Sequence, residues 1–286
     1  MTAITDVAAV PAAARTTAPL GRLLRSELRM MLRRPRTVVA LALLAVVPVI
    51  AGIAIRIASS GDGPVGEGLA VLVEGNGLML PIFTLLAALT MLLPLVGATL
   101  AADALAGESA HGTLRSLLIA PVGRGRLLAI KAFGVATVTL VATLVMALTG
   151  TITGVLLLGG DGMLTVSGTT LSFVDGLGRV LLAALLVAVQ VWGVAAVALA
   201  VSAWTDHPLI VLSVALGLLI VSGVLSAIPA LDWLEPFLIT TGWESIGEVV
   251  RDPIPWGSLS EGALRAGCYI VIGCSLALSR MLSRDG

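Results

Sequence analysis

The chain has 286 residues, of which 58% are hydrophobic and only 12% are charged, and its mean hydropathy is +1.07. A soluble domain carries about 25% charged residues, so this composition indicates a membrane protein. No basic face with interleaved aromatic residues occurs along the sequence, which argues against a nucleic-acid partner.

The N-terminal part of the chain combines a tail with a basic, helix-forming stretch. Residues 1–19 are rich in Ala, Thr, Val and Pro and lack the pattern of a signal peptide, so we expect a disordered cytoplasmic tail. In residues 20–36, leucines and methionine recur at helical spacing while arginines occupy most of the remaining surface. This pattern predicts an amphipathic helix lying on the membrane, and a solvated basic anchor that only sets orientation is the alternative.

Residues 37–286 are expected to form one membrane domain with six spanning helices. A span needs about 20 predominantly apolar residues. The sequence offers six such stretches, at about 37–57, 79–102, 127–158, 177–203, 209–228 and 263–282. Pro94 falls inside the second span, where it is either a hinge or a tolerated kink. Gly150 and Gly154 in the third span form a small-xxx-small pair, a pattern common where membrane helices pack closely.

The long acidic segment before the last span is harder to assign. Its apolar residues, between 231 and 238, are too few to span a bilayer and are interrupted by Pro236. We expect a short interfacial or re-entrant helix there, with Trp233, Trp243 and Trp256 at the depth of the lipid headgroups.

The distribution of basic residues predicts the orientation. If both termini are cytoplasmic, that side collects most of the Arg and Lys residues, and the other side keeps only Arg56, Arg179, Arg251 and Arg265. This asymmetry agrees with the positive-inside rule, and an even number of spans places both ends on one side.

The predicted spans contain little chemistry of their own. Their interiors lack charged residues, which argues against an ion-coupled carrier, since such carriers are expected to show an acidic residue at depth. Gln190, near the middle of the fourth span, is the main polar exception, and either an interhelical hydrogen bond or a substrate contact explains it. No phosphate-binding loop and no metal-binding spacing occurs, so if energy is used, a partner supplies it.

The stretch from Asp103 to Lys131 is the one long connection that mixes both charge signs with regularly spaced leucines. It predicts an amphipathic helix between the second and third spans, closed by Pro121. One face consists of Leu114, Leu117 and Leu118. The residues left to contact a soluble partner are Glu108, His111, Thr113 and Arg115, and Gly112 permits close backbone approach.

The run GESAHGTLRSLLIAPVGRGRLLAIKAFG resembles the region after the second span in permeases of the ABC-2 type, the membrane subunits of ATP-binding cassette exporters. The residues that carry the resemblance are Glu108, Gly112, Thr113, Leu114, Leu117, Leu118, Pro121, Val122, Arg124, Lys131 and Gly134.

The resemblance implies a permease dimer in the plasma membrane, docked on two copies of an ATPase subunit that binds ATP and Mg²⁺. Residues 108–118 would be the first coupling segment, and the turn with Asp206 and His207 resembles the second. His111 and His207 are then ordinary interface or solvated residues rather than pH sensors. Pro94 and Gln190 are candidates for the translocation path, and the expected substrate is a drug, lipid, peptide or glycan. An ion-coupled transporter and a non-transport scaffold are the competing hypotheses.

Overall fold

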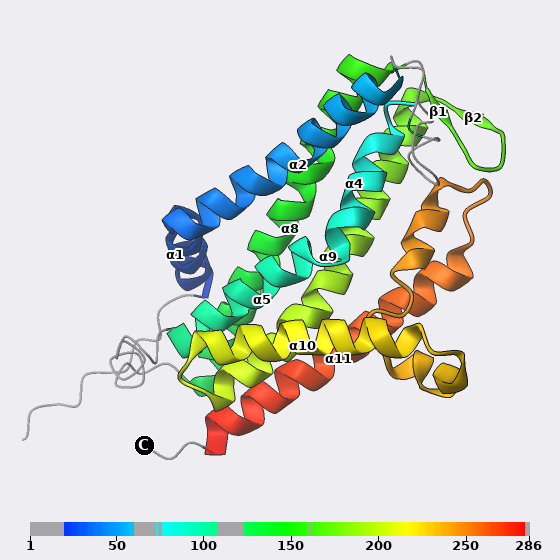
Figure 1. Ribbon diagram of the computed structural model, residues 1–286. Coiled ribbons are helices and arrows are strands. Elements are labelled where there is room, and N and C mark those ends of the chain that lie inside the picture. Colours follow the sequence, from blue (N-terminus) through cyan, green and yellow to red (C-terminus); the bar gives the residue numbers. More distant parts are fainter. Residues whose placement is uncertain (1–19, 60–72, 74–75, 108–122, 161, 284–286) are drawn as a thin grey trace, which may run out of the picture.

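The computed structural model describes residues 20–59, 73, 76–107, 123–160 and 162–283, and within these ranges the chain is almost entirely helical (Figure 1). Long α-helices are joined by two short 3₁₀ helices and one small hairpin. The α-helices are α1 (Leu20–Arg33), α2 (Pro35–Ser59), α4 (Met79–Leu89), α5 (Leu92–Ala104), α8 (Arg124–Leu158), α9 (Phe173–Trp204), α10 (Pro208–Ser226) and α11 (Trp256–Ser283). The other elements are β1 (Met163–Leu164), β2 (Thr170–Leu171), η1 (Pro229–Phe237) and η2 (Glu244–Val250).

The chain is an all-α polytopic membrane protein, as its composition predicts. Among the described residues, five helices are long and apolar enough to cross a membrane, namely α2, α8, α9, α10 and α11. The pair α4 and α5 passes the same test together, which gives six spans if the bent pair is one span. The last helix begins at Trp256 rather than near residue 263. Polar residues suggested a loop there, but Ser258 and Ser260 donate their hydroxyls to carbonyls three residues back within the first turns.

Helices α4 and α5, in the predicted second span, are bent by 55° at the break between them. Met91, which precedes α5, has φ −151° and ψ −48°, so the helical path is interrupted there. Pro94 lies in the first turn of α5, where its missing N–H costs no intrahelical hydrogen bond. The ladder resumes with Leu95, whose N–H donates to the Met91 carbonyl at 3.0 Å. The break therefore lies three residues before Pro94, which the sequence left as either a hinge or a tolerated kink.

Contacts between distant residues sort the helix ends into two sets. Arg36 at the start of α2 lies 3.9 Å from the Asp103 carboxylate at the end of α5, and Arg124 at the start of α8 reaches the end of α11. We call this the basic end; it also holds α1, the end of α9 and the start of α10. The β hairpin and η2 lie at the opposite end, which we call the cap end (Figure 1).

Helix α9 runs through the centre of the bundle, and small residues let its neighbours approach it closely. A Cβ on Gly273 of α11 would lie 2.6 Å from the Ala196 carbonyl of α9. The glycine pair of α8 packs against α4 in the same manner: a Cβ on Gly154 would lie 1.9 Å from the Gly77 oxygen, and one on Gly150 would lie 2.8 Å from Pro81 Cα. The close helix packing suggested by the small-xxx-small pair is thus confirmed.

The cap end is organised around Arg179 of α9. Its guanidinium donates to the carbonyls of Val249 and Arg251 at 3.0 and 2.8 Å and lies 3.3 Å from the Asp252 carboxylate. The acidic segment contributes two short 3₁₀ helices, η1 and η2, where the sequence predicted short helices. Trp243, which precedes η2, is only 7% exposed and packs in the hydrophobic core; its predicted headgroup depth stays a prediction.

Candidate functional site

The predicted first coupling segment lies outside the described residues. This applies to Glu108, His111, Gly112, Thr113, Leu114, Arg115, Leu117 and Leu118, since the description stops at residue 107 and resumes at residue 123. Its two flanks are described, however, and both lie at the basic end. The flanks show which helices the predicted segment connects.

A serine in α9 connects the first flank to the end of α9. The Ser202 hydroxyl is 1% exposed; it accepts a hydrogen bond from the Ala106 N–H at 2.9 Å and donates to the Ala102 carbonyl at 3.3 Å. Ala102 and Ala106 belong to the last turn of α5 and the residues directly after it. Because a buried hydroxyl that loses such partners costs about 1–3 kcal/mol, this bridge ties α5 firmly to α9.

The predicted second coupling element follows Ser202 by three residues. In the turn Thr205–Pro208, the His207 N–H donates to the Thr205 hydroxyl at 3.2 Å, and Pro208 starts α10 with the fixed φ that suits a first helical position. The side chains of Asp206 and His207 are exposed. The turn and the flank of the first segment therefore lie at the same end of the molecule, joined through Ser202.

The second flank is tied to α1 by a buried ion pair. The Lys131 ammonium of α8 lies 2.9 Å from the Glu27 carboxylate of α1, and the two side chains are 3% and 11% exposed. One turn further along α8, Gly134 lets Met31 approach, since a Cβ there would lie 2.6 Å from the Met31 sulfur. Helix α1 is thus docked on α8 by its Glu27 and Met31 side, and it does more than lie on the membrane through its leucines.

The start of α8 is also held against the end of α11. Arg124 donates to the carbonyls of Met281 and Leu282, both at 3.0 Å. These are among the last carbonyls of a helix, which have no partner within the helix itself, and a basic side chain is well suited to them. The helices that flank the predicted coupling segment, α5 and α8, are therefore each held to a neighbour at the basic end. The first and last described helices, α1 and α11, are both held to α8 there.

Comparison with known protein families places the chain in one of them. A family model described as ABC-2 family transporter protein matches residues 22–244, from α1 to the first residue of η2. The chain belongs to the ABC-2 transporter family. It is therefore a membrane permease component of an ABC transporter, in a family whose members work with an ABC ATPase. Comparison with curated proteins finds no significant match.

Two family-motif residues thereby gain a structural role in this ABC-2 permease. Lys131 and Gly134, two of the residues that carry the family resemblance, form the contact of α8 with α1. Glu27 and Ser202 were missed by sequence reasoning. A single serine in an apolar helix gives no signal, whereas the acidic residue among the arginines of α1 was a signal that could have been followed.

Gln190 of the permease is buried between α9 and α11. Its side chain is 4% exposed, and a Cβ on Gly262 would lie 3.5 Å from its amide nitrogen and 3.5 Å from the Ser245 hydroxyl oxygen. Within the described part of the chain the Gln190 amide makes no hydrogen bond, so the interhelical bond considered from the sequence is not formed there.

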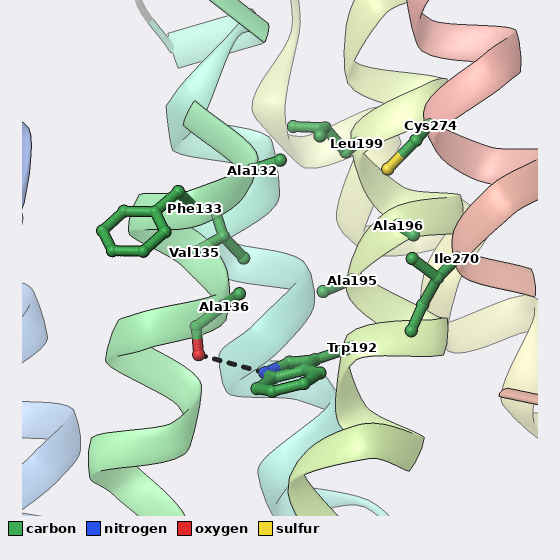
Figure 2. Close-up of a pocket in the computed structure, with 10 residues that line it drawn as sticks. All are labelled: Ala132, Phe133, Val135, Ala136, Trp192, Ala195, Ala196, Leu199, Ile270 and Cys274. Carbon is green, nitrogen blue, oxygen red and sulfur yellow. Dashed lines mark hydrogen bonds between the residues drawn. The ribbon is translucent and has the colours of Figure 1, made fainter. Parts of the chain in front are cut away.

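An apolar cavity lies between α8, α9 and α11, on the basic-end side of Trp192 (Figure 2). Its volume is about 250 Å³, and its walls include Ala136, Cys274 and Leu199. The Trp192 indole N–H donates to the Ala136 carbonyl and the Thr139 hydroxyl, both at 3.0 Å, so the ring is fixed across the floor. No group of three His, Cys, Asp or Glu side chains that could hold a metal occurs in the described ranges.

Proposed function

We propose that this permease is the membrane subunit of an ATP-binding cassette exporter in the plasma membrane. Two permease copies, identical or closely related, form the translocation path, and each docks on one ATPase subunit that binds ATP and Mg²⁺. The permease itself binds no cofactor. Both termini and the basic end face the cytoplasm, as the positive-inside rule requires for the arginine-rich side.

One observation carries the proposal: the Ser202 bridge joins the flank of the first coupling segment to the turn that would be the second. A partner that pushed on either element would move α5 and α9 together. For the partner to drive a conformational change, its ATP-bound and ATP-free states must contact these two elements differently. The exposed Asp206 and His207 and the segment 108–118 are the surfaces for that contact.

The break between α4 and α5 gives the motion a place to occur. Helix α4 is held by α8 at the glycine pair, whereas α5 is tied to α9 at the basic end. A change of dihedral angles around Met91 would tilt α5 while α4 stayed in place. In this mechanism Pro94 starts the moving half, and Gln190 offers a polar contact to the substrate in an otherwise apolar path.

The expected substrate is hydrophobic or amphiphilic: a drug, a lipid, a peptide or a glycan. The support is the composition of the described helix faces, since most of their buried side chains are hydrophobic. Gln190 is the buried polar side chain at the middle of α9, and serine and threonine hydroxyls make up most of the other buried polar groups.

The test is reconstitution of the permease with its ATPase in lipid nanodiscs, with ATP hydrolysis and substrate transport measured together. Glu108→Ala and Asp206→Ala should leave membrane insertion and complex assembly intact and abolish the stimulation of hydrolysis by the permease. Glu244→Ala, which changes an exposed carboxylate at the cap end, is the matched control and should behave as wild type. Unchanged coupled transport in the Glu108 variant would contradict the assignment of residues 108–118 as a coupling segment.

Ion-coupled transport is the alternative that the same preparation separates. Addition of an ionophore that collapses proton and sodium gradients leaves ATP-driven export unchanged in the proposed mechanism. Transport that stops with the ionophore and continues without ATP would instead identify an ion-coupled carrier.

A further inference from the structure

The cavity beside Trp192 differs from the rest of the lipid-facing surface because it is concave and bounded by three helices. Figure 2 shows α8 and α9 as its two sides, with Ile270 and Cys274 approaching from α11. Its lining is apolar, apart from the sulfur of Cys274 and the indole of Trp192, whose N–H is already bonded. An apolar occupant would therefore fill it without leaving any polar group unsatisfied.

The depth of the cavity matches the acyl region of one leaflet. Trp204 ends α9, is 60% exposed and stacks under the Arg280 guanidinium at 4.9 Å, which is the pairing expected at a membrane–water interface. Trp192 precedes Trp204 by twelve residues on the same helix, a distance of about 18 Å. Half of the hydrocarbon core measures about 15 Å, so the floor of the cavity lies near the bilayer midplane.

Helices α8 and α11 contribute basic side chains at the basic end, where Asp206 follows the end of α9. Helix α8 contains Arg124, Arg126 and Lys131 but no carboxylate, and α11 contains none after Glu261. Lys131 is paired with Glu27, whereas neither Arg124 nor Arg280 has an ion pair with a described residue. Arg280 lies six residues, about 9 Å, from Cys274 along α11 toward the basic end, and about a third of a turn around the helix from it.

We propose that this cavity is a binding site for an anionic phospholipid of the basic-end leaflet, with one acyl chain against Trp192 and Cys274 and the phosphate near Arg280 and Arg124. The bound lipid completes the junction of α8, α9 and α11. This inference concerns a resident lipid, goes beyond the transport function and does not depend on which substrate is exported.

The two cysteines of α11 supply a matched pair of variants. Cys274 lines the cavity, whereas Cys268 is exposed elsewhere on the same helix. The full-length permease is reconstituted in nanodiscs with equal amounts of phosphatidylglycerol and phosphatidylcholine and extracted in mild detergent, and retained lipid is counted by native mass spectrometry. The wild type should retain phosphatidylglycerol preferentially. Cys274→Phe should fill the cavity and abolish this retention, and Cys268→Phe should not.

The headgroup contact has its own pair. Arg280→Gln should lower the preference for phosphatidylglycerol by about fivefold, because one basic side chain at an anionic lipid surface contributes about 1 kcal/mol. Arg25→Gln, an exposed charge on α1 at the same end, should leave the preference unchanged. Phosphatidylglycerol brominated on its acyl chains should quench the fluorescence of Trp192 in the wild-type protein, and the signal of the other tryptophans is subtracted with the Trp192→Phe variant.

Three results would overturn the proposal. Equal retention of the two lipids by the wild type would show that no anionic site exists. Equal loss of lipid from the Cys274 and Cys268 variants would show that the cavity is not the site. A change of oligomeric state in Cys274→Phe, without loss of lipid, would show that a second permease copy occupies the cavity.

Discussion

Removal of the Lys131 charge should destabilise this permease more than any exposed charge change. At 2.9 Å and an effective dielectric constant of about 20, the attraction between Lys131 and Glu27 amounts to about 6 kcal/mol before the cost of desolvation. Lys131→Met leaves a carboxylate that is 11% exposed without its ammonium partner. Breaking a buried pair in this manner costs about 3–5 kcal/mol, and Glu27→Leu should cost a similar amount.

The double variant measures how much of the lost stability comes from the interaction between the Glu27 and Lys131 side chains. Replacement of a buried ion pair by two apolar residues of similar size is often nearly neutral, so Glu27→Leu with Lys131→Met should recover most of the stability lost in each single variant. Arg36→Gln is the control, because its pair with Asp103 is 3.9 Å apart with an 88% exposed arginine side chain and should contribute less than about 1 kcal/mol.

Denaturant unfolding in detergent measures these free energies, and trypsin cleavage at the arginines of α1 reports whether that helix stays docked on α8. The single variants should be cut faster than the wild type, and the double variant should be protected. If the costs of the two single changes simply add in the double variant, then Glu27 and Lys131 do not interact, and the docking of α1 has another cause.

Three further predictions follow from the packing. Gly154→Ala should destabilise the protein by about 1–3 kcal/mol in thermal unfolding, because the new Cβ would meet the Gly77 oxygen, whereas Gly178→Ala, with no atom within 4 Å, should be neutral or stabilising. Arg179→Gln should expose the chain around η2 to proteases, since two backbone carbonyls lose their donor; unchanged digestion would contradict this role. Gln190→Leu should preserve stability but lower transport, and a large loss of stability would instead indicate an unrecognised hydrogen bond.

The spans and the basic side could be predicted from the sequence because they depend on local composition. A helix such as α10 is apolar throughout its 19 residues, and no folded alternative would hide that surface from water. The break before Pro94 could be anticipated for the same reason, since proline affects the backbone within one turn. Its position at Met91 could not, because it depends on how α5 meets α9.

The contacts of the candidate site could not be predicted, since each joins residues far apart in the chain. Glu27 and Lys131 are separated by 104 positions, and Ser202 and Ala106 by 96. The local sequence pattern gives no partner for Lys131 and no role for Glu27. Glu27 is buried only because α1 docks on α8. The burial of Trp243 could not be predicted either, because the preference of tryptophan for headgroups does not tell whether the ring faces lipid or the core.

Helix α8 is longer than a membrane is thick. Its 35 residues measure about 52 Å, whereas the bilayer with its headgroups measures about 40–45 Å. The Leu158 end remains among apolar, exposed residues such as Leu156 and Ile152, so the surplus length lies at the Arg124 end. The first turns of α8, which hold Arg124, therefore extend past the lipid headgroups.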